Sequence, residues 1–318
     1  MAQKINWLDQ INNCAENRHS VAKEILQKYK KSSKSSAIFI SENAQVTYLY
    51  LHSYSLHPTH HLDNADFIRK LHDQGGLNIV APTLSAHEPN SKPEDFKSVR
   101  FEDWWLDAEL FLKLAGGLGK RVVLHGSSLG GLLSIQLAIK FPDLLDQLVL
   151  TSPALMLAYG SEKLAHAASL KPVRYVARKI FGNRVNTYGL GDYYDKYLYG
   201  LPTVAKSVKE IRAQAQEISA EHTSSDQSRP RKIWNSNLEQ ISQLAKKIKA
   251  ETTIIYSRSD QALSTKGLDT FVKNLANAEI FAYPKNQKIK HTDAIRNHAL
   301  PESSQFSHDF LYKKILRP

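Results

Sequence analysis

Ser128 stands at the centre of a Gly-x-Ser-x-Gly segment that runs from Gly126 to Gly130. A serine in this pattern can attack a carbonyl carbon when it lies on a sharp turn between a strand and a helix, because such a turn exposes the hydroxyl at the carboxyl end of a sheet. The backbone comes very close to its neighbours there, so the positions two before and two after the serine must be small. Gly126 and Gly130 meet this requirement. The alternative is an ordinary glycine-rich turn with an incidental serine.

The residues on either side of this motif support the first interpretation. Apolar residues 121–125 are typical of a short buried strand, and residues 131–139 are typical of a packed helix. We therefore predict a nucleophile elbow, with Ser128 as the nucleophile.

A serine hydroxyl is a poor nucleophile at neutral pH, so it needs a base to take its proton and an acid to orient that base. In chains with this elbow, the acid and then the base follow later strands. Asp260 follows the predicted strand 252–256, and His291 follows the predicted strand 280–283 through a polar loop. The sequence therefore predicts a catalytic triad of Ser128, Asp260 and His291.

Other residues compete for the roles of acid and base. Asp260 could be a simple turn aspartate, because aspartate is common in turns. His298 and His308 also follow the last strand, but His291 comes soonest after it and is favoured. Asp293 is a weaker candidate for the acid, since it lies only two residues from the base that it would have to face.

The tetrahedral intermediate of acyl transfer needs two backbone N–H donors. One is expected from Leu129, which follows the nucleophile at a helix N-terminus, and the other from the loop after the strand 46–51. In that loop Tyr54 is the first choice for the donor, with Ser53 second.

Strands and helices alternate along most of the chain, which predicts an α/β fold with a mostly parallel sheet. A β-hairpin is also expected, pairing residues 37–40 with 46–51. The expected strands are 46–51, 77–81, 121–125, 148–151, 252–256 and 280–283, and the expected helices are 67–72, 101–114, 131–139, 238–249, 268–276 and 306–315.

The alternation divides the chain into four segments. Residues 1–36 form a polar, partly helical lead-in, and residues 37–153 form the first part of the α/β core. Residues 154–235 interrupt the alternation with a helical, tyrosine-rich and basic insertion, and residues 236–318 complete the core.

The chain resembles the α/β-hydrolase fold family, in particular its bacterial carboxylesterase and monoacylglycerol lipase branch. Two loops depart from the family pattern. Ser53 replaces the usual glycine of a His-Gly pair, and Ser85 and Glu88 replace glycines of a Gly-His-Gly type turn. The segments that carry the resemblance are 51–54, 82–88, 101–104, 126–131, 257–260 and 290–293.

The resemblance covers residues 45–155 and 235–315 and implies a mostly parallel central sheet with helices on both faces. It also implies that the inserted segment is a lid, and that the protein is a serine hydrolase that cleaves carboxylic esters through an acyl-enzyme. An acyltransferase or a proline-type serine peptidase would use the same triad. A non-catalytic binding protein fits less well, because such proteins usually lose a triad member and here all three are in order.

Composition sets the expectations for partners. The net charge of +11 should attract anionic surfaces. Apolar and basic residues interleave over 171–184, which would allow peripheral contact between the lid and an anionic membrane. No nucleic-acid motif accompanies the charge, so we expect a small-molecule acyl ester as partner and no nucleic acid.

The same composition bears on compartment and cofactors. Cys14 is the single cysteine, which excludes an internal disulfide and suits a reducing compartment. No apolar run reaches the ~18 residues of a membrane span, and the first residues lack a secretory signal, so we expect a cytoplasmic protein. Triad hydrolysis needs no cofactor, and the cluster of His57, His60, His61 and Asp63 is expected to be a polar loop and not a metal site.

Overall fold

The structure is a computed structural model. It describes residues 1–156 and 230–291, except for 15, 55, 60–64, 75, 93–94, 96–97, 261 and 290, together with residues 206, 208, 309, 311–313 and 315. Most of the predicted lid over 154–235 lies outside the described residues, as do His60, His61 and Asp63 and the competing candidates Asp293, His298 and His308.

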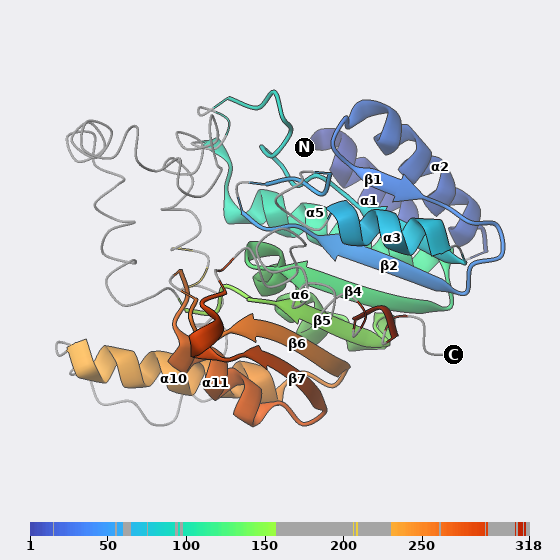
Figure 1. The fold of residues 1–318 in the computed structure, drawn as a ribbon. Coiled ribbons are helices and arrows are strands. Elements are labelled where there is room, and N and C mark those ends of the chain that lie inside the picture. Colours follow the sequence, from blue (N-terminus) through green and yellow to red (C-terminus); the bar gives the residue numbers. More distant parts are fainter. Residues whose placement is uncertain are drawn as a thin grey trace.

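The described strands form one sheet in the order β1-β3-β2-β4-β5-β6-β7 (Figure 1). All neighbouring pairs are parallel except β1 and β3, so the prediction of a mostly parallel sheet is confirmed. The strands are β1 (Ala37–Phe39), β2 (Val46–Leu51), β3 (Leu77–Ala81), β4 (Arg121–Ser127), β5 (Gln147–Thr151), β6 (Glu251–Ser257) and β7 (Ala278–Tyr283).

The predicted hairpin between residues 37–40 and 46–51 is wrong. β1 pairs with β3 in antiparallel fashion, with Ile38 opposite Val80. β2 has no free edge for β1, because Tyr48 lies between Ile79 of β3 and Val123 of β4. A sequence pattern reports which residues are buried but does not say which strand will occupy each edge.

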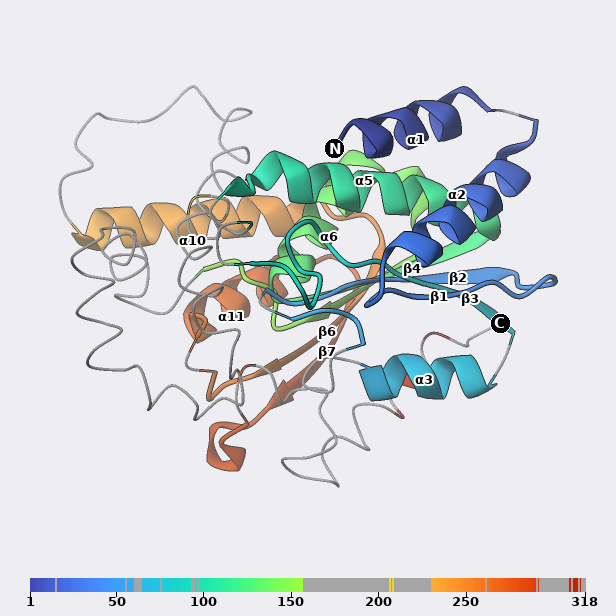
Figure 2. The same cartoon turned by 90° about the horizontal axis from the view of Figure 1, so that it is seen from above.

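Helices cover both faces of the sheet (Figure 2), as predicted, and successive strand residues point to opposite faces. Leu49 and Leu51 belong to the larger core cluster, whereas Tyr48 and Tyr50 belong to the smaller one. The larger cluster is covered by α1 (Ala2–Asn13), α2 (Arg18–Ser32), α5 (Phe101–Leu118), α6 (Leu129–Lys140), α10 (Pro230–Lys246) and α11 (Thr265–Asn274). The smaller cluster is covered by α3 (Ala65–Gln74) and by Leu311 and Ile315 near the C-terminus.

The N-terminal segment is two well-packed helices and not merely a polar lead-in. Trp7 and Ile11 of α1 and Ile25, Leu26 and Tyr29 of α2 are buried in the larger core cluster. The ring of Tyr29 packs edge-on against Phe111 of α5, with the ring centroids 4.7 Å apart. The helical pair therefore adds a layer outside α5, which itself packs on the sheet.

The elements after β5 follow the predicted order. α10 begins at Pro230 and so runs across the expected boundary at 235 and 236. Short 3-10 turns lie at Pro142–Leu144 and Lys285–Gln287. Within the described part of the chain, no helix combines the length and the apolar character that crossing a membrane requires.

Candidate active site

Ser128 lies between β4 and α6 with a positive φ of 51°. A non-glycine residue rarely adopts this conformation, so the surrounding structure must hold it. The Ser128 N–H donates to the carbonyl oxygen of Thr151 at 2.9 Å. The Ser128 carbonyl oxygen accepts from the N–H groups of Leu132 at 3.1 Å and Ala154 at 3.0 Å. These three bonds fix the turn that presents the serine hydroxyl.

The two glycines of the motif are required by close backbone contacts. A Cβ atom at Gly126 would lie 2.3 Å from the carbonyl oxygen of Gly130 and from the Ser134 hydroxyl. A Cβ atom at Gly130 would lie 2.0 Å from the carbonyl oxygen of Leu51. The elbow is therefore pressed against the end of β2, where the loop of residues 52–54 begins.

A chain of hydrogen bonds joins the three residues predicted as a triad. The Nε2 atom of His291 is 2.9 Å from the Ser128 hydroxyl oxygen, and its Nδ1 atom is 2.7 Å from the Oδ2 atom of Asp260. An ionised carboxylate only accepts hydrogen bonds, so it selects the tautomer with the proton on Nδ1. The Nε2 lone pair then faces the serine hydroxyl, which is the arrangement that a general base needs.

The topology explains how residues far apart in sequence meet. β4, β6 and β7 are parallel, so their carboxyl ends lie at one edge of the sheet, and Ser128, Asp260 and His291 all follow those ends. The side chain of Asp260 is fully buried, whereas 19% of the His291 side chain is exposed. The carboxylate of Asp260 is thus shielded from water, while the imidazole of His291 is partly exposed.

The two carboxylate oxygens of Asp260 have different partners. Its Oδ1 atom accepts from the N–H groups of Ala262 at 2.9 Å and Leu263 at 3.0 Å, as a turn aspartate would. Its Oδ2 atom remains for His291. The turn therefore orients the carboxylate toward the imidazole.

Ser257 has a supporting role that the sequence reasoning missed. Its hydroxyl donates to the carbonyl oxygen of Ile289 at 2.7 Å and so fixes the loop just before His291 to the end of β6. The hydroxyl of Ser259 approaches the same oxygen at 3.3 Å. The two serines stand two residues apart in the segment Ser257-Arg258-Ser259-Asp260, but the sequence does not reveal which carbonyl oxygen their hydroxyls approach.

Two fully buried histidines lie beside the elbow and are held neutral. His125 is bonded to the Tyr48 hydroxyl at 2.5 Å and to the Thr151 hydroxyl at 2.8 Å, and burial lowers its pKa to about 3. His52 accepts the Leu84 N–H on Nε2 at 2.9 Å, so its Nδ1 carries the proton and donates to the carbonyl oxygen of Ser53 at 2.8 Å. Burial, and then the neighbouring His87, lower the pKa of His52 well below its usual value.

The two residues predicted as oxyanion donors lie on the segments that meet at the elbow. Leu129 is the first residue of α6 and is buried. Tyr54 is buried in the loop after β2, with its ring edge-on to Trp104 at 6.0 Å. Ser53 is the second choice for this donor, and its carbonyl oxygen accepts the Nδ1–H of His52.

Among the described residues, no group of three His, Cys, Asp or Glu side chains is arranged to hold a metal ion.

Comparison with known proteins gives a family match over most of the core. Residues 89–286 match the family model described as serine aminopeptidase, S33 (Hydrolase_4). An uncharacterized protein of Mycobacterium tuberculosis is 27% identical over 150 residues, which are 42% of this chain and 40% of that protein. The chain thus spans about two fifths of the length of that relative. Lipase 3 of Moraxella is 22% identical over 243 residues, covering 74% of this chain and 71% of the lipase.

Solved structures confirm the predicted α/β-hydrolase fold. The monoacylglycerol lipase of Paleococcus ferrophilus superimposes with a TM-score of 0.58 at 15% identity, covering 88% of this chain and 97% of the lipase. A soluble variant of the monoglyceride lipase of Saccharomyces cerevisiae gives a TM-score of 0.57 at 11% identity, covering 88% and 90%. At these identities the likeness concerns the fold.

Gly130→Ala should destabilise the protein by about 1–3 kcal/mol or more, because the new methyl group would overlap the Leu51 carbonyl. Gly116→Ala, inside α5, is the matched control, because the new Cβ would lie at an ordinary contact distance of 3.7 Å from the Leu144 side chain. That change should be neutral or stabilising by up to about 1 kcal/mol. Urea unfolding of both variants measures the difference, and equal stabilities would contradict the close contact.

The neutral state of His125 predicts a dependence of stability on pH. The unfolded state binds a proton near the usual pKa of 6.5, whereas the folded state does not bind one until about 3. Stability should therefore fall as the pH drops below 6.5, by up to about 1.4 kcal/mol per pH unit for this residue. In His125→Gln the free energy of unfolding should change less steeply with pH. The control is His72→Gln, because the His72 side chain is 47% exposed. If the slope of stability against pH is unchanged in His125→Gln, then His125 is not a buried neutral group in the folded protein.

Proposed function

Because the chain belongs to the serine aminopeptidase S33 family, whose model matches residues 89–286, we propose that it is a serine hydrolase that cleaves carboxylic esters. The observation that carries the proposal is the hydrogen-bond chain from Ser128 through His291 to Asp260. Its directions and distances suit proton transfer from the serine hydroxyl to the imidazole.

The reaction proceeds in two stages. Ser128 Oγ attacks the ester carbonyl while His291 Nε2 takes its proton, and Asp260 stabilises the imidazolium that forms. The tetrahedral intermediate collapses, His291 protonates the departing alcohol oxygen, and the acyl group remains on Ser128. Water, deprotonated by His291, then attacks the acyl-enzyme and releases the carboxylic acid, which restores the serine. No step requires a cofactor.

The N–H groups of Leu129 and Tyr54 stabilise the negative charge on the intermediate. Leu129 begins α6, and the N-terminus of a helix favours negative charge. Tyr54 belongs to the loop that the close contact between Gly130 and Leu51 holds beside the elbow. A single donor of this kind is worth about 3 kcal/mol of transition-state stabilisation.

The substrates are acylglycerols or similar esters of short to medium acyl chains. Lipase 3 of Moraxella supports this class, as does Lipase 1 of Psychrobacter immobilis, which is 24% identical over 223 residues. We also propose that the basic residues of the segment 154–235, most of which lies outside the described residues, allow contact with an anionic membrane surface.

A proline-type peptidase is the second candidate, because the matched family is described as a serine aminopeptidase. The triad would attack an amide carbonyl in the same way, and only the leaving group would differ. Cleavage of p-nitrophenyl esters should exceed cleavage of prolyl p-nitroanilide if the ester proposal is right. The reverse ranking would replace it with the peptidase.

Ser128→Ala should lower kcat for p-nitrophenyl butyrate by at least about 10³-fold, because the attacking oxygen is lost. It should also abolish covalent labelling by a fluorophosphonate. Ser98→Ala, at an exposed serine, is the control and should keep both. Retained turnover in Ser128→Ala would exclude this serine as the nucleophile. A panel of p-nitrophenyl esters of increasing acyl length then defines the substrate class.

A further inference from the structure

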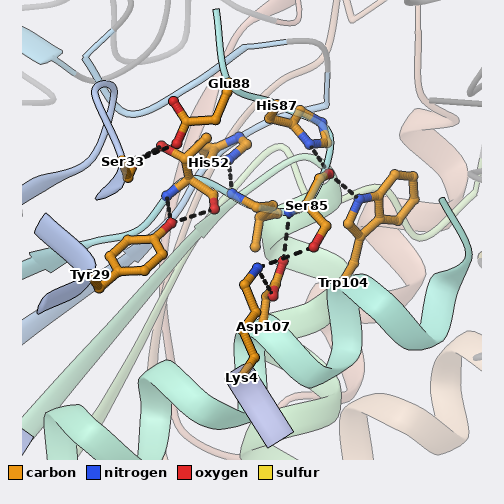
Figure 3. A network of polar contacts seen from close by, with 11 residues as sticks. Lys4, Tyr29, Ser33, His52, Ser85, His87, Glu88, Trp104 and Asp107 are labelled. Atoms are coloured by element: carbon orange, nitrogen blue, oxygen red, sulfur yellow. Dashed lines mark hydrogen bonds and ion pairs between the residues drawn. The ribbon is translucent and has the colours of Figure 1, made fainter. Parts of the chain in front are cut away.

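A network of buried polar contacts joins the N-terminal helices to the loops beside the elbow (Figure 3). We call residues 52–54 the β2 loop and residues 82–88 the β3 loop. The helices α1 and α2 make these contacts from outside the sheet and α5. The network therefore couples the N-terminal helices to a loop of the candidate active site.

Asp107 of α5 and Lys4 of α1 together hold Ser85 of the β3 loop. Its side chain has no exposed surface, and its Oδ2 atom accepts the Ser85 N–H at 2.6 Å. Its Oδ1 atom is paired with the ammonium group of Lys4 of α1, which also donates to the Ser85 hydroxyl at 3.2 Å. A buried carboxylate is costly without a charged partner, so Lys4 stabilises Asp107 in the position from which it accepts the Ser85 N–H.

The β3 loop in turn holds the β2 loop. The Leu84 N–H donates to Nε2 of His52, whose Nδ1–H donates to the carbonyl oxygen of Ser53. The carbonyl oxygen of Ser85 accepts from the Trp104 indole N–H at 3.0 Å. Trp104 packs edge-on against the ring of Tyr54, with the centroids 6.0 Å apart. A hydrogen-bond path from Leu84 therefore reaches the Ser53 carbonyl, which belongs to the same peptide group as the Tyr54 N–H. A packing path from Ser85 through Trp104 reaches the Tyr54 ring.

α2 holds the other part of the β3 loop. The Tyr29 hydroxyl donates to the carbonyl oxygen of Thr83 at 2.8 Å and accepts the Thr83 N–H at 3.1 Å. The hydroxyls of Ser33 and Ser35, just after α2, donate to the Glu88 carboxylate at 2.5 Å and 2.8 Å. Ser85 and Glu88, which depart from the family's glycine pattern, are thus among the β3-loop residues that contact the N-terminal helices, the serines after them or Asp107.

We propose that Lys4 and Asp107 are positioning residues for the oxyanion donor Tyr54, and that α1 is required for full catalytic rate. The proposal rests on the proposed ester hydrolysis. Both residues act through Ser85, Leu84 and His52 and do not touch the nucleophile. Loosening the β2 loop should therefore weaken binding of the transition state more than binding of the substrate, because the N–H donor is needed when the oxyanion forms.

Kinetics with p-nitrophenyl butyrate test the catalytic part. Lys4→Met should lower kcat about 10- to 100-fold while KM changes less than about 2-fold, since a small misplacement of a catalytic group can cost that much. Lys4→Arg should recover most of the rate. Lys28→Met is the matched control, because Lys28 makes only an exposed pair with Glu24 on α2 and should keep the wild-type rate. A wild-type kcat in Lys4→Met, or a loss confined to KM, would overturn the proposal.

A double variant tests the path through Asp107. Asp107→Asn keeps an acceptor for the Ser85 N–H but removes the charge that Lys4 pairs with. If the two residues act as one unit, Lys4→Met combined with Asp107→Asn should be no slower than the worse single variant. If the losses in kcat of the two single variants multiply in the double variant, then Lys4 and Asp107 act separately and the shared path is wrong. Asp107→Asn and Lys4→Arg also keep the test valid if Lys4→Met fails to fold.

Hydrogen exchange gives a readout that does not depend on activity. Amides of the β2 and β3 loops should exchange faster in Lys4→Met than in the wild type or in Lys28→Met, while α6 and the strands stay protected. Unchanged loop exchange would overturn the coupling whatever the rate. If the wild type cleaves no ester and the exchange still rises, then the ester function is wrong and the coupling stands, so the two failures are distinguishable.

Discussion

The turn at Ser128 places the start of α6 so close to the end of β2 that the Cα of Gly130 lies against the carbonyl of Leu51. Everything proposed for the site depends on this contact. The same turn holds Ser128 at a positive φ, and the contact brings the loop after β2 beside Ser128. A side chain larger than hydrogen at Gly130 would separate Ser128 from that loop.

Around this contact, the protein buries polar side chains, and the imidazoles among them are neutral. His125 and His52 are fully buried and uncharged, and each has a hydrogen-bond partner on both ring nitrogens. A buried neutral imidazole with both nitrogens satisfied costs far less than a buried charge. Asp107 and Asp260 are the exceptions, and each is matched by a cationic or N–H partner.

The N-terminal helices hold the β3 loop through side-chain contacts. A loop built from glycines must lose much conformational entropy on folding. Here Ser85 and Glu88 place side chains and backbone in a network anchored by Lys4, Tyr29 and the serines after α2. The N-terminal helices outside α5 thus restrict the backbone of the β3 loop through specific contacts.

The sequence by itself determined the alternation of strands and helices, the elbow at Gly126 to Gly130, and the choice of Ser128, Asp260 and His291, because each depends on local pattern and chain order. Tertiary structure alone decided that β1 pairs with β3, that the N-terminal helices belong to the core, and that Ser257, Lys4 and Asp107 hold the loops. These last features depend on which strand edge is free and which buried atom lacks a partner, and such information exists only when distant segments are packed together.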